Sequence, residues 1–166
     1  MDIFDSPKDC IRTNSGIFMN VFETSDEMIN IEDIAHALAS LPRFGGHTDK
    51  QYSVAQHSVM CYTFAKTLED KKAALMHDAS EAYLLDIPTP IKAKLPDYKS
   101  IEEKLMIAIA AKYGFEFPLS DNVHKIDREM LLLEWKLLVV DKGVATECWS
   151  QEYAKQMFLE AFNSLF

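Results

Sequence analysis

Side chains that could carry out chemistry gather in one apolar stretch of the chain. The segment ALMHDASEAYLLDIPTP, residues 74–90, contains His77, Asp78 and Glu81 within an otherwise apolar helical pattern. At helical spacing these three side chains share one broad face with apolar neighbours, so they are directed toward the core or toward a pocket in it. Burying an unpaired carboxylate costs several kcal/mol unless an ion partner, a hydrogen-bond network or a metal compensates it. The pattern therefore predicts a buried polar site.

Two other helical segments can contribute to that site. In SVAQHSVMCYTFAKTLE, spacings of three and four residues define an inward face that contains Val54, His57, Cys61, Phe64 and Leu68. In HKIDREMLLLEWKLL, Asp127 shares one face with Met130, Leu131 and Glu134. Four polar side chains from three helices can then meet in one place: His57, His77, Asp78 and Asp127.

Each of these residues has a plainer explanation when it is taken alone. A single inward histidine is more often a hydrogen-bonded core residue than a ligand, and Asp127 could simply pair with Lys125 or Arg128. Cys61 reads as core filling. The combination of His, His-Asp and Asp on three inward faces is what favours a site.

The elements that position these residues are predicted to be almost entirely helical. Apolar periodicity, the Ser53–Gln56 capping box and glycines at 114 and 143 as helix ends indicate an all-α bundle of about six helices, at residues 31–41, 53–69, 71–85, 98–113, 120–141 and 149–163. A small hairpin is expected within residues 11–22, and Pro42 with Gly45-Gly46 marks a loop over residues 42–52.

Composition limits the class of protein. A chain of 166 residues that is 48% apolar fits one globular domain, residues 1–166. The acidic start and the lack of a membrane-length apolar run favour a soluble cytoplasmic protein. Its net charge of −9 disfavours nucleic-acid and anionic-membrane binding. The three cysteines, Cys10, Cys61 and Cys148, form no CxxC pair and are expected to be reduced thiols.

The order His57, His77-Asp78, Asp127 resembles the H...HD...D signature of the HD-domain phosphohydrolases, a family of helical metal-dependent enzymes. The segments RFGGHTDKQYSVAQHS, ALMHDASEAYLLDIPTPIK and IDREMLLLE are similar to the branch that contains bacterial 5′-deoxynucleotidases and phage-type dATP triphosphohydrolases. The resemblance covers residues 31–138 and implies an HD-domain helical bundle.

The resemblance also implies roles for individual residues. His57, His77, Asp78 and Asp127 would hold one divalent metal ion. Glu81 would orient or deprotonate the attacking water, and Asp86 would support catalysis. Arg43 would bind the substrate phosphate. The next residue is Phe44, where the deoxynucleotidases often have tryptophan, so selection for deoxyribose by that aromatic residue is an open question.

The chemistry of these residue types agrees with such roles. Two imidazoles and two carboxylates suit Mn, Co, Fe or Zn, with Mg also possible, and leave positions open for water and a phosphate oxygen. Arg43 offers a bidentate fork to phosphate, and Lys92 is a second cation in a segment, residues 86–92, that is expected to wall the pocket. His47 could touch substrate, although a structural hydrogen bond is the preferred interpretation for it.

The expected activity is hydrolysis of a nucleotide, with a deoxynucleoside 5′-mono- or triphosphate as substrate. Alarmone and cyclic-nucleotide hydrolysis remain alternatives because the same four ligands serve all three reactions. A non-catalytic nucleotide-sensing module and a purely structural bundle are the opposing classes. A homo-oligomer is expected, with Tyr153 and Phe158 of the last helix as exposed aromatic residues at its interface.

Overall fold

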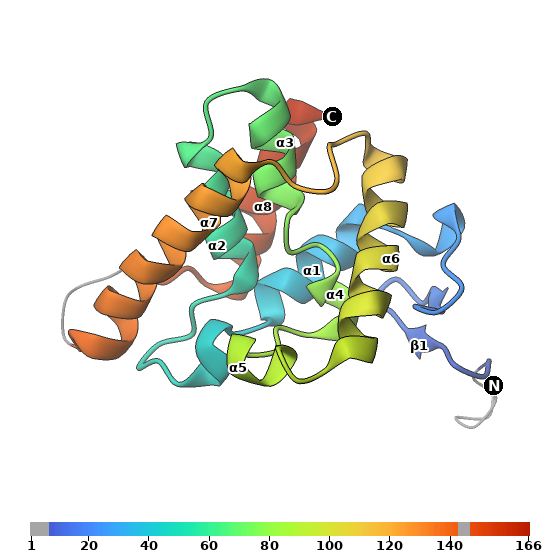
Figure 1. Cartoon of the computed structure of the whole chain (residues 1–166), viewed down its shortest axis with the longest axis horizontal. Coiled ribbons are helices and arrows are strands. Elements are labelled where there is room, and N and C mark those ends of the chain that lie inside the picture. The colour runs from blue at the N-terminus through green and yellow to red at the C-terminus, as the bar shows by residue number, and fades with distance from the viewer. Residues whose placement is uncertain (1–6, 143–146) are drawn as a thin grey trace.

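The computed structural model describes residues 7–142 and 147–166 and shows an all-α fold with a small hairpin (Figure 1), which confirms the predicted fold class. Strands β1 (Ile11–Arg12) and β2 (Phe18–Met19) pair antiparallel, with Ile11 opposite Met19. Within the described residues, six helices have nine or more residues: α1 (Ile31–Ser40), α2 (Val54–Phe64), α3 (Leu68–Met76), α6 (Pro96–Tyr113), α7 (Asp121–Glu134) and α8 (Gln151–Leu165).

Shorter helical turns connect these six helices. They are η1 (Asp26–Met28), η2 (Arg43–Gly46), α4 (Glu81–Leu84), α5 (Thr89–Lys92) and the π-helix η3 (Trp135–Val140) that continues α7. None of the helices in the described part of the chain is both long and apolar enough to cross a lipid bilayer.

Local sequence signals explain where several helices begin and end. Ser53 Oγ accepts a hydrogen bond from the Gln56 backbone N at 3.1 Å, as half of the predicted capping box. The Gln56 side chain does not complete the box, because it bonds Glu147 O and Trp149 N and so ties α2 to the segment before α8. Gly114 ends α6 in the left-handed conformation, as predicted. The predicted stop at Gly143 lies outside the described residues.

The single helix predicted over residues 71–85 is wrong. Helix α3 ends at Met76, and the chain makes a turn before α4 begins at Glu81. Tight hydrogen bonds from residue i+3 to residue i replace the α-helical pattern here, including Ala79 N to Met76 O and Glu81 N to Asp78 O, each at 3.0 Å. His77 and Asp78 therefore lie in a turn rather than on a helix face.

Helix α2 is shorter than the predicted 53–69. The chain leaves the helix at Ala65 and begins α3 with Thr67, whose side chain caps the new helix. Phe64 and Leu68 consequently point outward, with exposed fractions of 52% and 54%, so their predicted inward orientation is wrong.

The core lies where α8 packs against α1, α2 and α3. Phe158 is completely buried there, so the prediction that it is exposed is wrong. It occurs on the inward face of α8 with Ala154, Ala161 and Phe162. Tyr153 is exposed, as expected.

Candidate metal centre and active site

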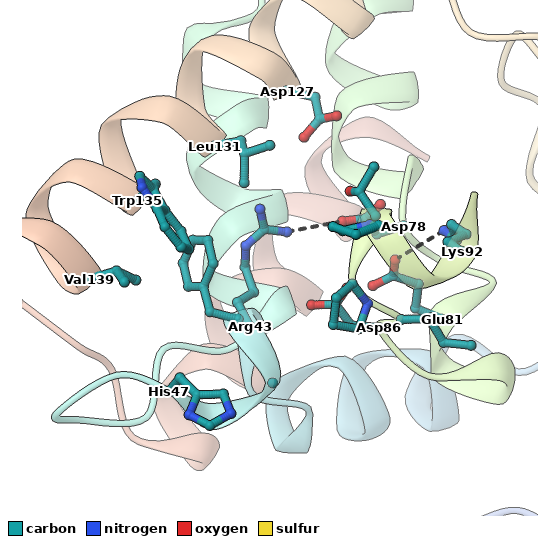
Figure 2. Close-up of a pocket in the computed structure, with 16 residues that line it drawn as sticks. Arg43, His47, Asp78, Glu81, Asp86, Lys92, Asp127, Leu131, Trp135 and Val139 are labelled. Carbon is teal, nitrogen blue, oxygen red and sulfur yellow. Dashed lines mark ion pairs between the residues drawn. The ribbon is translucent and has the colours of Figure 1, made fainter. Parts of the chain in front are cut away.

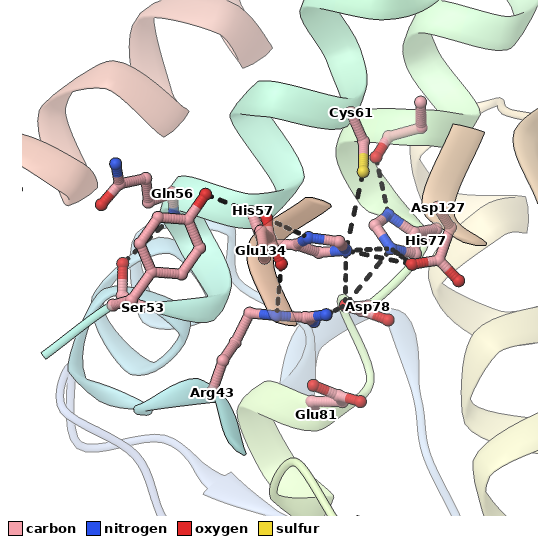
Figure 3. A network of polar contacts seen from close by, with 12 residues as sticks. Arg43, Ser53, Gln56, His57, Cys61, His77, Asp78, Glu81, Asp127 and Glu134 are labelled. Atoms are coloured by element: carbon pink, nitrogen blue, oxygen red, sulfur yellow. Dashed lines mark hydrogen bonds and ion pairs between the residues drawn. The ribbon is translucent and has the colours of Figure 1, made fainter. Parts of the chain in front are cut away.

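Side-chain atoms that could bind a metal ion, from α2, α7 and the turn after α3, converge beside the core (Figure 3). His57 Nε2 lies 3.2 Å from His77 Nε2 and 3.1 Å from Asp127 Oδ1. One ligand atom each of His57, Cys61, His77 and Asp127 lies within 4.8 Å of the others. The described residues thus include a group that could hold a metal ion.

The hydrogen bonds of the two imidazoles fit this role. Ala74 O can only accept, so His77 Nδ1 must donate to it at 2.7 Å. Likewise His57 Nδ1 donates to the Glu134 carboxylate at 2.8 Å. In the neutral rings both Nε2 lone pairs then face the same point, where they repel unless a proton or a metal ion lies between them. The donor set therefore fits a bound metal.

Asp78 reaches the same point from the cavity side. Its Oδ2 lies 3.2 Å from His77 Nε2, 3.9 Å from His57 Nε2 and 3.7 Å from Arg43 Nη1. Burial raises the pKa of Asp78, but the charges of His77, His57 and Arg43 together lower it by more. The pKa of Asp78 is therefore held below its usual range. The structure brings all four predicted ligands together: His57, His77, Asp78 and Asp127.

The same balance acts on the other members of the group. Burial raises the pKa of Asp127, but hydrogen bonds from His57 and His77 hold it well below its ordinary value. Burial lowers the pKa of His77, yet Asp78 and Asp127 raise it well above its ordinary value. The group therefore attracts positive charge.

Glu134 organises the buried side of the site. The sequence analysis placed it on the same helix face as Asp127 and assigned it no role. Its side chain contacts His57 Nδ1, the Tyr52 hydroxyl at 2.9 Å and Arg43 Nε at 3.1 Å. Burial raises the pKa of Tyr52, and Glu134 raises it further, so the phenol stays protonated. Its O–H donates the hydrogen bond to this carboxylate. The signal for Glu134 was its position seven residues, or two turns, after Asp127 on the same face.

A cavity of about 610 Å³ opens beside the metal-ligating group (Figure 2). Its lining includes all the other predicted site residues, namely Arg43, Phe44, Glu81, Asp86 and Lys92, together with Asp78 and Asp127. The predicted wall is present, since most of residues 86–92 line the cavity. His47 also lines it.

Glu81 and Lys92 form one side of this cavity. Glu81 is 5% exposed, and its Oε1 lies 3.9 Å from Lys92 Nζ, which also pairs with Glu102 at 2.6 Å. Burial raises the pKa of Glu81 well above its ordinary value, and Asp78 and Asp86 add to this effect, while Lys92 and Arg43 oppose it. Burial also raises the pKa of Asp86. A buried carboxylate with a raised pKa is suited to accept a proton near neutral pH.

The opposite side of the cavity is apolar. Figure 2 shows Trp135 and Val139 across from Glu81 and Lys92, with Arg43 between the two sides. Phe44 meets Trp135 edge to face, with ring centroids 5.7 Å apart. Phe44 adopts φ +57°, a left-handed conformation that is strained for this residue and that recurs at binding sites. The π-helix η3 supplies Trp135 and Val139 to this wall. The sequence pattern indicated a regular α-helix here and gave no sign of the wider π-helical turn.

Comparisons with known proteins give relatives but no activity. No protein-family model matches the chain. The chain is 40% identical over 169 residues to YfdR of Escherichia coli, an uncharacterized protein, and the match covers 93% of this chain and 94% of that protein. It is 37% identical over 112 residues to the uncharacterized protein RCAP_rcc00048 of Rhodobacter capsulatus, which covers 62% of this chain and 57% of that protein.

Proposed function

This chain belongs to the family of Escherichia coli YfdR, and we propose that it is a metal-dependent phosphohydrolase of the HD type that acts on nucleotides. The observation that carries the proposal is the meeting of two imidazole Nε2 atoms and two carboxylates at the edge of a cavity that also contains a buried arginine. The order His57, His77-Asp78, Asp127 along the chain supports the HD assignment.

His57, His77, Asp78 and Asp127 would hold one divalent ion. When bound, such an ion polarises a phosphoryl oxygen and makes a bound water more acidic. The ligand types suit Mn, Co, Fe or Zn, with Mg also possible. Asp78 and Asp127 also line the cavity, where substrate would enter.

Arg43 would bind the phosphate. Burial lowers the pKa of its guanidinium, but Glu134 and Asp78 raise it more, so Arg43 stays charged. Glu134 contacts Nε, and Nη1 lies 3.7 Å from Asp78, so the outer edge of the guanidinium is directed toward the proposed metal site. A planar fork held in this way suits the oxygens of a phosphate.

Glu81 would act on water. In the proposed reaction water attacks phosphorus, the phosphorus–oxygen ester bond breaks, the leaving oxygen takes up the proton that the water gives up, and nucleoside and inorganic phosphate leave. Glu81 would take the proton of the attacking water, and its raised pKa makes it a stronger base than an exposed glutamate. Asp86 and Lys92, on the same wall, would orient the leaving side of the substrate.

The charges that line the cavity favour a monophosphate over a triphosphate. Asp78, Glu81, Asp86 and Asp127 face Arg43 and Lys92, and both cations already have carboxylate partners. A triphosphate would bring about four negative charges into this acidic surface, whereas a monophosphate brings about two. The aromatic wall of Phe44 and Trp135 would receive the nucleobase.

Product analysis with the purified full chain tests the proposal. Ribo- and deoxynucleoside mono-, di- and triphosphates are incubated with Mn, Co, Zn or Mg, beside Asp78→Ala as the inactive variant and Asp33→Ala as a matched control outside the site. We expect phosphate release from monophosphates by the wild type and Asp33→Ala alone. Hydrolysis of alarmones or cyclic nucleotides would correct the substrate, and nucleotide binding without any turnover would identify a sensing module.

An assembly of several copies of this chain is proposed as well, and light scattering on the purified protein tests it.

A further inference from the structure

Cys61 was expected only to fill the core, and it is indeed 1% exposed. Its Sγ nevertheless lies 3.6 Å from His57 Nε2, inside the group of ligand atoms (Figure 3). The two residues are four apart on α2, so both side chains leave the same face of the helix, one turn from each other. This helical spacing places the sulfur beside the imidazole.

We propose that Cys61 supplies a thiolate ligand to the metal centre, on its buried side, and that the centre therefore takes a thiophilic ion of the zinc, cobalt or iron class. The inference rests on the proposed metal site. It adds a ligand that the resemblance to HD enzymes does not provide, because that resemblance implies two histidines and two aspartates.

The distances agree with sulfur and nitrogen bound to one ion. Zinc–sulfur bonds are about 2.3 Å and zinc–nitrogen bonds about 2.0–2.1 Å, so ligand–metal–ligand angles of about 90–110° place the two ligand atoms about 3.1–3.6 Å apart. The observed separation of Cys61 Sγ and His57 Nε2 is 3.6 Å. The separations of His57 Nε2 from His77 Nε2 and Asp127 Oδ1, 3.2 and 3.1 Å, are also those of atoms that share an ion.

The placement of Cys61 leaves the cavity side of the ion for reactants. Cys61 is absent from the described residues that line the cavity, whereas Asp78 and Asp127 line it. A thiolate is a soft ligand that Mg²⁺ does not favour, but zinc, cobalt and iron do. Binding would release the thiol proton to solvent, since a cysteine ligates as the thiolate.

Cobalt absorption gives a direct test, and its first variant leaves the residues of the cluster unchanged. The double variant Cys10→Ser/Cys148→Ser keeps Cys61 as the sole cysteine, because the chain has three. Loaded with one equivalent of Co²⁺, it should show the near-ultraviolet charge-transfer band of a cobalt–thiolate bond. Adding Cys61→Ser should remove that band while metal analysis still finds cobalt bound.

Metal affinity provides the second readout. In chelator competition, Cys61→Ser should weaken Zn²⁺ and Co²⁺ binding at least about tenfold and leave Mg²⁺ binding nearly unchanged. Cobalt bound without the band would overturn the thiolate and leave the phosphohydrolase standing. The band without nucleotide hydrolysis would support the thiolate and overturn the phosphohydrolase, and absence of any bound metal would overturn both.

Discussion

Two carboxylates of this protein are almost equally buried, yet their surroundings differ. Asp33, in the first turn of α1, is 3% exposed, and Glu81, at the start of α4, is 5% exposed. Both Asp33 oxygens accept hydrogen bonds from Ser15, one from the backbone N at 2.7 Å and one from the hydroxyl at 2.6 Å. Among the described residues, Glu81 Oε2 has no hydrogen-bond partner.

The difference separates a carboxylate that stabilises the fold from one that is kept for chemistry. Asp33 ties the hairpin to α1 and also lies where the helix dipole favours a negative charge. A buried polar atom without a partner costs about 1–3 kcal/mol, so Glu81 destabilises the metal-free protein. Such a residue is expected where a substrate, water or ion completes its contacts.

The largest expected effect is on turnover by Glu81→Gln. The amide keeps the size of the side chain but cannot accept the proton of the attacking water, so kcat should fall about 100- to 10,000-fold. Steady-state kinetics on the best nucleotide of the panel measures this, with metal content determined in parallel. An unchanged kcat with full metal loading would remove Glu81 from the reaction.

The sequence could predict that His57, His77, Asp78 and Asp127 meet in space, because they are close in type and spacing to a known signature. It could also predict most helices, since periodicity and caps such as Ser53 are local signals. It failed at residues 76–81, where a turn that depends on tertiary packing breaks a strong helical pattern. Glu134 was missed because only the packing of α2 against α7 shows that it reaches His57. Cys61 lies one turn after His57 on α2, but that spacing alone does not separate a side chain beside a site from a core residue.

The next largest effect is expected on metal binding by Glu134→Gln. Glu134 fixes the His57 ring with Nδ1 as donor and holds Arg43 at the same time. Loss of the carboxylate that orients a metal-ligating histidine typically weakens metal affinity about 10- to 100-fold. Chelator competition measures the change.

Glu129→Gln on the same helix provides the control for that measurement. Its side chain is 67% exposed, and its ion pair within the described residues is with another exposed residue, Lys125. We expect metal affinity to remain at the wild-type value in this variant. Equal losses in the two variants would show that charge on α7, rather than the contact with His57, determines the affinity.

Asp33→Ala should lower stability and leave kcat unchanged, whereas Glu81→Gln mainly lowers kcat. It removes both hydrogen bonds from Ser15 and should lower the free energy of unfolding by about 1–3 kcal/mol. For a chain of this size each kcal/mol shifts Tm by about 2–4 °C. Calorimetry measures the shift, and kcat per folded molecule should not change. A loss of kcat at full folding would mean that the hairpin contributes to the site.

The smallest effect, and the most specific, is the pH dependence of stability that Glu81 contributes to the metal-free protein. Because burial, Asp78 and Asp86 raise its pKa on folding, Glu81 loses its proton at lower pH in the unfolded chain than in the folded protein. Between the unfolded and the folded pKa of Glu81, unfolding releases a proton. The contribution of Glu81 to the free energy of unfolding is therefore complete below the unfolded pKa and declines as pH rises through the folded pKa. Glu81→Gln has no such dependence. Denaturant titrations from about pH 4 to pH 8 should therefore show the variant gaining stability relative to wild type as pH rises, whereas parallel curves would mean that Glu81 keeps its ordinary titration in the fold.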